Sequence, residues 1–255
     1  MNSQAHSFID FYQNFFPIND STLKAEIKIK VIILAPHPDD ECLMASLALR
    51  LKIENKAEVL AVAVTLGSNE KRRSERTLEF NDSCQVLGFE PYLIASDDWK
   101  DKENFISQII TDKSINLIIA PHLNDHHPAH IKTSRLARKI ISDTAFNGVL
   151  LESEFWGELP SPNLLIEVTK DVFTLEFNAL TKHQGEITRN PYHLRLAANL
   201  VNNVRLGAEK VQALGESSPD FAFGNLYQLY QVKDGVPTLV PPQILDYQSD
   251  LSLIF

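Results

Sequence analysis

Ala35-Pro36-His37-Pro38-Asp39-Asp40-Glu41 is the most informative stretch of the 255-residue chain. It directly follows the apolar run 31–34 and directly precedes the apolar-periodic stretch 43–51. This order predicts a buried strand, a tight turn and a helix. One imidazole and three carboxylates therefore crowd a single strand-to-helix turn. In an open α/β sheet, ligands bind at the carboxyl ends of strands, which is where such a turn lies.

Strand and helix patterns alternate along the chain from residue 28. Strand patterns cover 29–35, 59–65, 91–95, 117–120, 148–152, 164–169 and 225–232. Helix patterns cover 42–54, 72–87, 105–112, a stretch from Pro128, 172–187 and 193–214. Strands separated by helices predict βαβ units. We therefore expect a Rossmann-like α/β fold, with a mostly parallel sheet and helices on both faces.

A single domain is expected over residues 1–255, because no internal repeat, low-complexity tract or linker interrupts the chain. Its core spans about 29–232. A short amphipathic helix over 4–16 precedes the core. The tail 237–255 is interrupted by prolines, so we expect it to be irregular.

Composition narrows the class of partners. The net charge of −9 disfavours nucleic acid and anionic membranes. Cys42 and Cys84 form no CxxC pair, which indicates buried free thiols in a reducing compartment. The N-terminus lacks a signal-peptide pattern, and no apolar run reaches the ~20 residues that a membrane span needs. We therefore expect a cytoplasmic protein without a membrane span, and leave open whether it forms a homo-oligomer.

The turn after the first strand has the residue types of a metal site. Pro38 fixes its own φ and biases His37 toward an extended conformation, so His37 and Asp40 can aim at one point. Histidine nitrogen and carboxylate oxygen suit zinc at ~2.0–2.2 Å. The side chain of Asp39 can then point off the metal, toward a bound water. In the alternative interpretation, the carboxylates only cap the helix and favour its positive end.

A second polar cluster, Pro121-His122-Leu123-Asn124-Asp125-His126-His127-Pro128-Ala129-His130, follows the strand pattern 117–120 and holds four of the eight histidines. It lies at the carboxyl end of a strand, at the same sheet edge as His37. A catalytic zinc needs three protein ligands and one open position. His37, Asp40 and one histidine of this cluster supply that set. The alternative is a histidine-rich surface loop without function.

The two motifs resemble those of the PIG-L/LmbE-like zinc de-N-acetylases. The first signature of that family, A-H-P-D-D-E after a strand, is matched by residues 36–41, with Pro36 in place of alanine. The second, P-H-x-x-D-x-H-P-D-H, is matched by residues 121–130 except at Ala129. Weaker similarity extends over about 29–232. The family removes acetyl groups from N-acetylglucosamine conjugates.

The resemblance implies a metal-dependent N-deacetylase with a small amino-sugar substrate. It implies that His37, Asp40 and His130 are the metal ligands and that Asp39 is the general base for a zinc-bound water. It also implies that His127 stabilises the oxyanion or protonates the leaving amine. Zinc is the expected metal, with iron or another divalent ion left open because histidine and aspartate accept several.

One departure from the family concerns the orientation of His127. Ala129 stands where the family has an aspartate that orients this imidazole. A neighbouring carboxylate raises a histidine pKa, so its loss weakens the case for an imidazolium. Asp125 and Glu154 are the candidate substitutes.

Other departures concern the substrate. Arg76 matches an arginine that contacts substrate in relatives, but Glu176 replaces a lysine and Gly185-Glu186 replaces Ser-Gln. We therefore expect a different distal substrate wall. Two alternative functions stay open: a non-catalytic metal- or sugar-binding relative, and the same amide hydrolysis on a different N-acyl substrate. A serine hydrolase is disfavoured because no G-x-S-x-G motif occurs.

Overall fold

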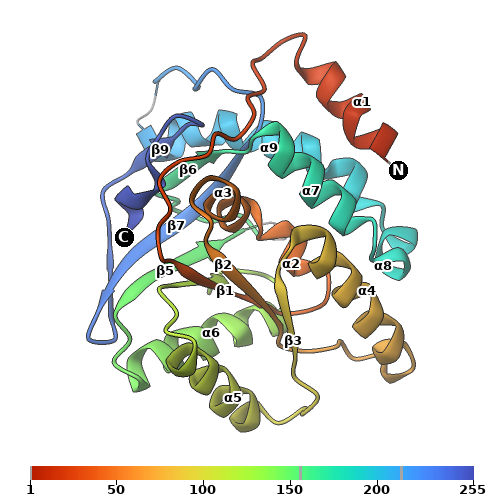
Figure 1. Cartoon of the computed structure of the whole chain (residues 1–255), viewed down its shortest axis with the longest axis vertical. Helices are drawn as coiled ribbons and strands as arrows, with labels where there is room; N and C mark the ends of the chain where they lie inside the picture. Colours follow the sequence, from red (N-terminus) through yellow and green to blue (C-terminus); the bar gives the residue numbers. More distant parts are fainter. Residues whose placement is uncertain (1, 155–156, 213–214) are drawn as a thin grey trace.

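The computed structural model describes residues 2–154, 157–212 and 215–255, which form one nine-stranded sheet with helices on both faces (Figure 1). The strands lie in the order β3-β2-β1-β4-β5-β7-β6-β9, and β8 pairs with β7. Their bounds are β1 Lys30–Ala35, β2 Glu58–Ala63, β3 Glu90–Leu93, β4 Leu117–Pro121, β5 Gly148–Ser153, β6 Leu164–Glu167, β7 Gly224–Lys233, β8 Val236–Leu239 and β9 Gln243–Leu245.

The sheet is mostly parallel, as predicted. β3, β2, β1, β4 and β5 form parallel pairs, and β6 pairs in parallel with β9. β7 is the exception, because it runs antiparallel to both β5 and β6. β1 and β4 are direct neighbours, so the loops that follow them leave the same edge of the sheet side by side.

Side chains of the central strands alternate between two hydrophobic layers. In β1, Val31 and Ile33 belong to the layer that contains buried residues of α1 to α4, α7 and α9, whereas Ile32 and Leu34 belong to the layer that contains those of α5 and α6. Figure 1 shows α5 and α6 on one side of the sheet and the other helices opposite. The helices are α1 Asn2–Tyr12, α2 Asp40–Leu43, α3 Ser46–Asn55, α4 Arg73–Leu87, α5 Trp99–Asp112, α6 Pro128–Asp143, α7 Lys170–Leu180, α8 Gln184–Arg189 and α9 Leu196–Gly207. Within the described part of the chain, every helix is too short or too polar to cross a membrane.

The helix expected over 42–54 is interrupted, since α2 ends at Leu43 and α3 begins at Ser46. The Ser46 hydroxyl donates a 2.6 Å hydrogen bond to the buried carboxylate of Glu176 on α7. Apolar residues continue across the break, so the hydrophobic period could not reveal it.

The helix expected over 172–187 is also interrupted, because α7 ends at Leu180 and α8 begins at Gln184. In the turn between them, His183 is fully buried and lies 2.6 Å from Glu41, measured from Nε2 to Oε1. A contact with a distant carboxylate therefore sets this break, and no local pattern marks it.

The helix expected over 193–214 divides into a 3-10 turn at Tyr192–Arg195, helix α9 and a π-helical turn at Ala208–Gln212. Residues 213 and 214 of that prediction lie outside the described part of the chain. The irregular tail predicted over 237–255 is wrong, because it contributes β8 and β9. Pro237 is tolerated in β8 because this is an edge strand, where a missing N–H costs no central ladder bond.

Two further helix ends differ from expectation. α1 ends at Tyr12, earlier than expected, and α5 begins at Trp99, also earlier than expected. The carboxylate of Asp98 accepts a 2.6 Å hydrogen bond from the backbone N–H of Lys100. This N-cap lets α5 start before its apolar stripe begins.

A polar network that includes the buried carboxyl of Glu176 lies in the core between α3, α7 and β7. Besides its bond to Glu176, Ser46 accepts a 3.0 Å hydrogen bond from the Asn225 side chain, which also donates to the Tyr227 hydroxyl at 3.2 Å. Burial raises the pKa of Glu176 from 4.5 to about 8. The folded protein therefore keeps this carboxyl protonated at pH values where the unfolded chain ionises it.

The free energy of unfolding should accordingly fall as the pH rises from 4.5 to about 8, and Glu176→Gln should remove this contribution. Unfolding releases the Glu176 proton in this window, which gives a slope of up to about 1.4 kcal/mol per pH unit. Urea unfolding at a series of pH values measures the difference. Glu58→Gln, at an exposed position of β2, is the control and should follow the wild type. Parallel curves for wild type and Glu176→Gln would contradict the shifted pKa.

Candidate metal centre

In the turn after β1, the side chains of three consecutive acidic residues point in different directions. Asp39 has a φ of 118°, a region that costs non-glycine residues about 1–3 kcal/mol. Two hydrogen bonds from the backbone hold the turn: the N–H of Asp39 donates to Glu41 Oε2 at 2.7 Å, and the N–H of His37 donates to Asp40 Oδ2 at 2.9 Å. The acidic side chains thus fix the backbone from which they project.

Asp40 meets two histidines from separate loops. Its Oδ2 lies 3.3 Å from His37 Nδ1 and 3.4 Å from Nε2 of His130, which belongs to the first turn of α6 after β4. Donor atoms around a tetrahedral ion with bonds of ~2.0–2.2 Å lie about 3.3–3.6 Å apart. The distances from Asp40 to the two histidines therefore match the spacing of ligands around one ion.

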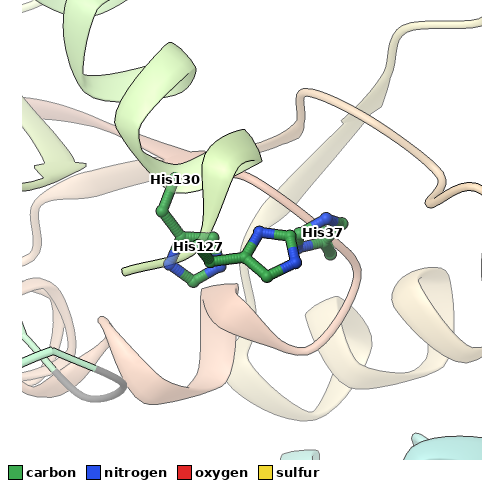
Figure 2. A group of neighbouring side chains, drawn as sticks. All are labelled: His37, His127 and His130. Atoms are coloured by element: carbon green, nitrogen blue, oxygen red, sulfur yellow. The ribbon is translucent and has the colours of Figure 1, made fainter. Parts of the chain in front are cut away.

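His127 lies beside this donor set. Figure 2 shows His127 and His130 at the start of α6, facing His37 on the opposing turn. A nitrogen from each ring lies within 4.8 Å of the others. His127 caps α6, because its Nδ1 accepts a 3.2 Å hydrogen bond from the backbone N–H of Ala129. A neutral ring that accepts at Nδ1 carries its proton on Nε2.

The charges of the donor set favour a cation. Burial alone would raise the pKa of Asp40, but His130 and His37 hold it well below its usual range. Burial likewise opposes the charge on His130, yet Asp40 and Asp125 raise its pKa to about 10. The negative charge of the two carboxylates favours a proton on His130. The same charge attracts a metal cation, which competes with that proton for the imidazole nitrogen. The donor types, their spacing and their charge all fit zinc or a similar divalent ion.

Asp125 orients His130. Its Oδ2 lies 3.1 Å from His130 Nδ1, which leaves Nε2 of that ring on the side of Asp40. A carboxylate that holds the second nitrogen of a ligating histidine fixes its tautomer and orientation. Asp125 was expected only as a partner of His127, so this role was missed, although Asp125 is part of the second histidine motif.

The structure gives no carboxylate partner to the ring of His127 among the described residues. The Oδ1 of Asp125 accepts a 2.7 Å hydrogen bond from the backbone N–H of His127, and Glu154 accepts one from the backbone N–H of Leu159. Burial and the neighbouring His37 lower the pKa of His127. The expectation that one of these carboxylates replaces the missing aspartate is therefore wrong, and His127 is neutral near pH 7.

Asp39 takes no part in these donor contacts. The Tyr192 hydroxyl donates a hydrogen bond to its Oδ2, and both residues are buried. Burial, with the charge of Asp40, raises the pKa of Asp39 to about 8, although the bond from Tyr192 opposes this shift. Tyr192 was not predicted as a site residue, because no motif surrounds it and only the tertiary fold brings it to the turn.

Glu41 anchors the turn from the core. Its Oε1 lies 2.6 Å from Nε2 of His183 and accepts hydrogen bonds from the Ser83 hydroxyl and, at 3.3 Å, from the Cys42 thiol. Burial opposes a charge on His183, but Glu41 outweighs it and raises the pKa. Glu41, Cys42 and His183 are also close enough to hold an ion. Both carboxylate oxygens of Glu41 already accept hydrogen bonds, so we interpret this group as support for the turn.

Two residues expected at the substrate wall have different surroundings. The guanidinium of Arg76 donates to the backbone oxygen of Leu66 at 3.3 Å and to Glu186 at 2.7 Å. Glu176 lies in the core instead, so it forms no part of a substrate wall. Of the residues that depart from the family motifs, Glu186 is the one that contacts Arg76.

The segment that holds both motif loops also matches a known protein family. A family model described as PIG-L, GlcNAc-PI de-N-acetylase, matches residues 32–141, which include both motif loops. The resemblance drawn from the motifs is thus confirmed over this segment. No curated protein sequence matches the chain.

Solved structures share the fold at low sequence identity. N,N'-diacetylchitobiose deacetylase from Pyrococcus horikoshii is 17% identical, with a TM-score of 0.59 over 81% of this chain and 84% of that one. The 4-carboxy-2-hydroxymuconate hydratase GalB from Pseudomonas putida KT2440 is 15% identical, with a TM-score of 0.63 over 85% and 100%. The zinc inhibited form of teicoplanin deacetylase Orf2 is 14% identical, with a TM-score of 0.58 over 80% and 99%. These likenesses confirm the α/β fold.

Asp125→Ala should weaken metal binding about 10–100-fold, because His130 loses the group that orients it. Competition with a zinc-sensitive dye measures the affinity. Asp82→Ala, at an exposed position of α4, should bind metal like the wild type. Unchanged affinity in folded Asp125→Ala would show that His130 needs no such support.

Proposed function

We propose that this protein is a metal-dependent hydrolase that removes the N-acetyl group from an N-acetylglucosamine-type conjugate. The observation that carries the proposal is the convergence of His37, Asp40 and His130, with the carboxyl of Asp39 beside them and outside their contacts. The description of the matching family model, GlcNAc-PI de-N-acetylase, supports the substrate class. So do the names of the neighbours that are deacetylases of chitobiose and teicoplanin.

We assign the metal to His37, Asp40 and His130. When bound, a divalent cation would polarise the amide carbonyl and make a water more acidic. Zinc is the first candidate. One structural neighbour is a zinc inhibited form, so metal content and activity have to be measured together.

Asp39 acts first as a base and then as an acid. Its carboxyl accepts a proton from the attacking water and returns it to the departing nitrogen. Efficient proton transfer in both directions needs a pKa near the working pH. Burial raises the pKa of Asp39 to about 8 in the metal-free protein, and a cation bound beside it would lower that pKa again. The Tyr192 hydroxyl holds one oxygen of Asp39 and leaves the other for the reacting groups.

His127 donates to the oxyanion that develops from the carbonyl oxygen. With Nδ1 engaged by Ala129, the proton of the neutral ring is on Nε2 and is available as a fixed hydrogen-bond donor. Loss of one such donor costs ~10²–10³ in rate in other enzymes. A neutral imidazole does not supply the proton for the amine, so we assign that step to Asp39.

The fold by itself does not select this reaction. GalB has the same fold and is a hydratase, so function has to be argued from the site. A purely binding relative would not need the base at Asp39, whereas amide hydrolysis needs a group that carries a proton from water to nitrogen. Assays on a panel of N-acyl conjugates would identify the acyl group and the rest of the conjugate.

Asp39→Asn should lower kcat about 10²–10⁴-fold while the metal content stays at the wild-type level, because the amide cannot take the proton. Asparagine tolerates a positive φ, so the turn is preserved. Amine release from N,N'-diacetylchitobiose and other N-acetylglucosamine conjugates measures activity. Asp82→Asn is the control. Near wild-type rates with metal bound would exclude Asp39 as the base.

Tyr192→Phe removes only the hydroxyl that holds Asp39. A hydrogen bond to a charged group contributes about 1.5–3 kcal/mol, so kcat should fall about 10–100-fold with little change in KM. The same assay, with metal content determined in parallel, measures the effect. Tyr12→Phe on α1 should behave like the wild type. An unchanged kcat would mean that Asp39 does not depend on Tyr192.

A further inference from the structure

Three arginines converge on a single carboxylate near the candidate site. Glu186 Oε1 accepts hydrogen bonds from Arg72 Nη1 at 2.6 Å and from Arg76 Nη2 at 2.7 Å, and its Oε2 accepts one from Arg189. The Glu186 side chain is only 3% exposed. Burial opposes its charge, but Arg76 and its neighbours lower the pKa of Glu186 to about 2. The neighbouring guanidinium groups therefore favour the ionised carboxylate of Glu186.

Two glycines make room for this arginine cluster, which we define as Arg72, Arg76 and Arg189. A Cβ at Gly185 would lie 1.7 Å from Arg72 Nη2, and a Cβ at Gly67 would lie 2.2 Å from Arg76 Nη1. Gly185 and Glu186 thus act together: Gly185 leaves space for the guanidinium group of Arg72, and Glu186 offsets its positive charge. These are the two positions at which the sequence departs from the Ser-Gln of the family.

The cluster borders the reacting groups. Glu186 and Arg189 belong to α8, and the chain continues from α8 to Tyr192, whose hydroxyl bonds Asp39. The carboxylate of Glu186 raises the pKa of Arg189, and the charge of Asp39 adds to this shift. On the other side, Arg76 contacts the loop at 65–67, and the Thr65 hydroxyl of that loop donates a 2.8 Å hydrogen bond to the backbone oxygen of Pro36, next to His37.

The cluster also reaches solvent. The Arg189 side chain is 73% exposed and that of Arg72 is 24% exposed. Guanidinium groups bind phosphates and carboxylates in paired hydrogen bonds, so an arginine cluster at this place is suited to an anionic substrate group. Here, however, Glu186 already takes those bonds. Glu75 and Glu79 lie 3.3 Å and 3.6 Å from Arg72, so the positive charge is balanced within the protein.

We propose that Glu186 is a specificity-determining residue, which occupies as an internal carboxylate the position that a substrate phosphate or carboxylate would take among Arg72, Arg76 and Arg189. The inference rests on the proposed function and narrows its substrate class to conjugates that are uncharged on this side. An anionic substrate group would have to displace Glu186 and would be repelled by the negative charge of its carboxylate. Repulsion of this kind lets a site discriminate against a close relative of its substrate.

The test compares a neutral and an anionic probe. Glu186→Gln keeps the size of the side chain and one acceptor oxygen but removes the charge. We expect kcat/KM for N-acetylglucosamine 1-phosphate, relative to kcat/KM for N,N'-diacetylchitobiose, to rise at least tenfold. Glu75→Gln is the matched control, because Glu75 also bonds Arg72 but is half exposed, and its ratio should stay at the wild-type value. Glu186→Ala repeats the test with a smaller neutral side chain.

Phosphate affinity provides a readout that does not depend on turnover. Calorimetric titration of the metal-loaded protein with inorganic phosphate should give a Kd at least tenfold lower for Glu186→Gln than for wild type or Glu75→Gln. Phosphate bound at the metal contributes equally to all three. Adding Arg189→Gln to Glu186→Gln should reverse much of the gain, and this exposed position can be changed without disturbing the core.

The outcomes separate the two proposals. If neither probe is hydrolysed by the wild type, the proposed function on these conjugates fails, and the phosphate titration alone decides whether Glu186 blocks an anion site. If both probes are hydrolysed but folded Glu186→Gln and Glu186→Ala keep the wild-type ratio and phosphate affinity, the inference about Glu186 is overturned.

Discussion

The buried ion pair between Glu41 and His183 is the interaction on which the candidate site depends. Glu41 uses one oxygen for His183 and the other for the backbone N–H of Asp39. It thereby holds Asp39 at its positive φ, and in this conformation Asp40 turns to the histidines while Asp39 turns to Tyr192. A buried ion pair adds little to stability once the cost of desolvation is counted. Its value here lies in geometry, because it fixes a turn that would otherwise relax.

Charge is separated across the site in a way that suits hydrolysis of a neutral amide. The donor set around Asp40 is negative and attracts a cation. His127 stays uncharged and provides a fixed N–H. Glu186, Glu75 and Glu79 together balance the charge of the arginine cluster. Under the proposed function, strong charge would lie where the carbonyl is activated and balanced charge where the rest of the conjugate binds.

Much of the fold could be predicted because burial leaves a direct mark on the sequence. The parallel sheet could be predicted from the apolar runs of β1 to β5. The loops that bring His37, Asp40 and His130 together could be predicted from the polar clusters after β1 and β4. The breaks around Ser46 and His183 leave no such mark, because apolar spacing continues through them. The strands β8 and β9 were missed because prolines obscure them.

The supporting residues of the site could not be predicted for a related reason. Asp125 was expected to orient His127, whereas it contacts the ring of His130. Tyr192 lies in a 3-10 turn with no motif around it. Their roles follow from contacts between segments that are distant in the chain. Ala129 was expected to affect His127, but the hydrogen bond that His127 Nδ1 accepts from the backbone N–H of Ala129 could not be predicted from the motif.

The order of the contacts along the chain has a consequence for biogenesis. His183 and Tyr192 follow their partners in the first turn by 142 and 153 residues. Contacts of such long range close late in folding, and a ribosome adds only about 5–20 residues per second. Both histidine-bearing loops therefore leave the ribosome well before the segments that fix their geometry. Assembly of the candidate site is in this way tied to completion of the polypeptide, and a stalled or truncated product would carry the proposed ligands without the contacts that position Asp39.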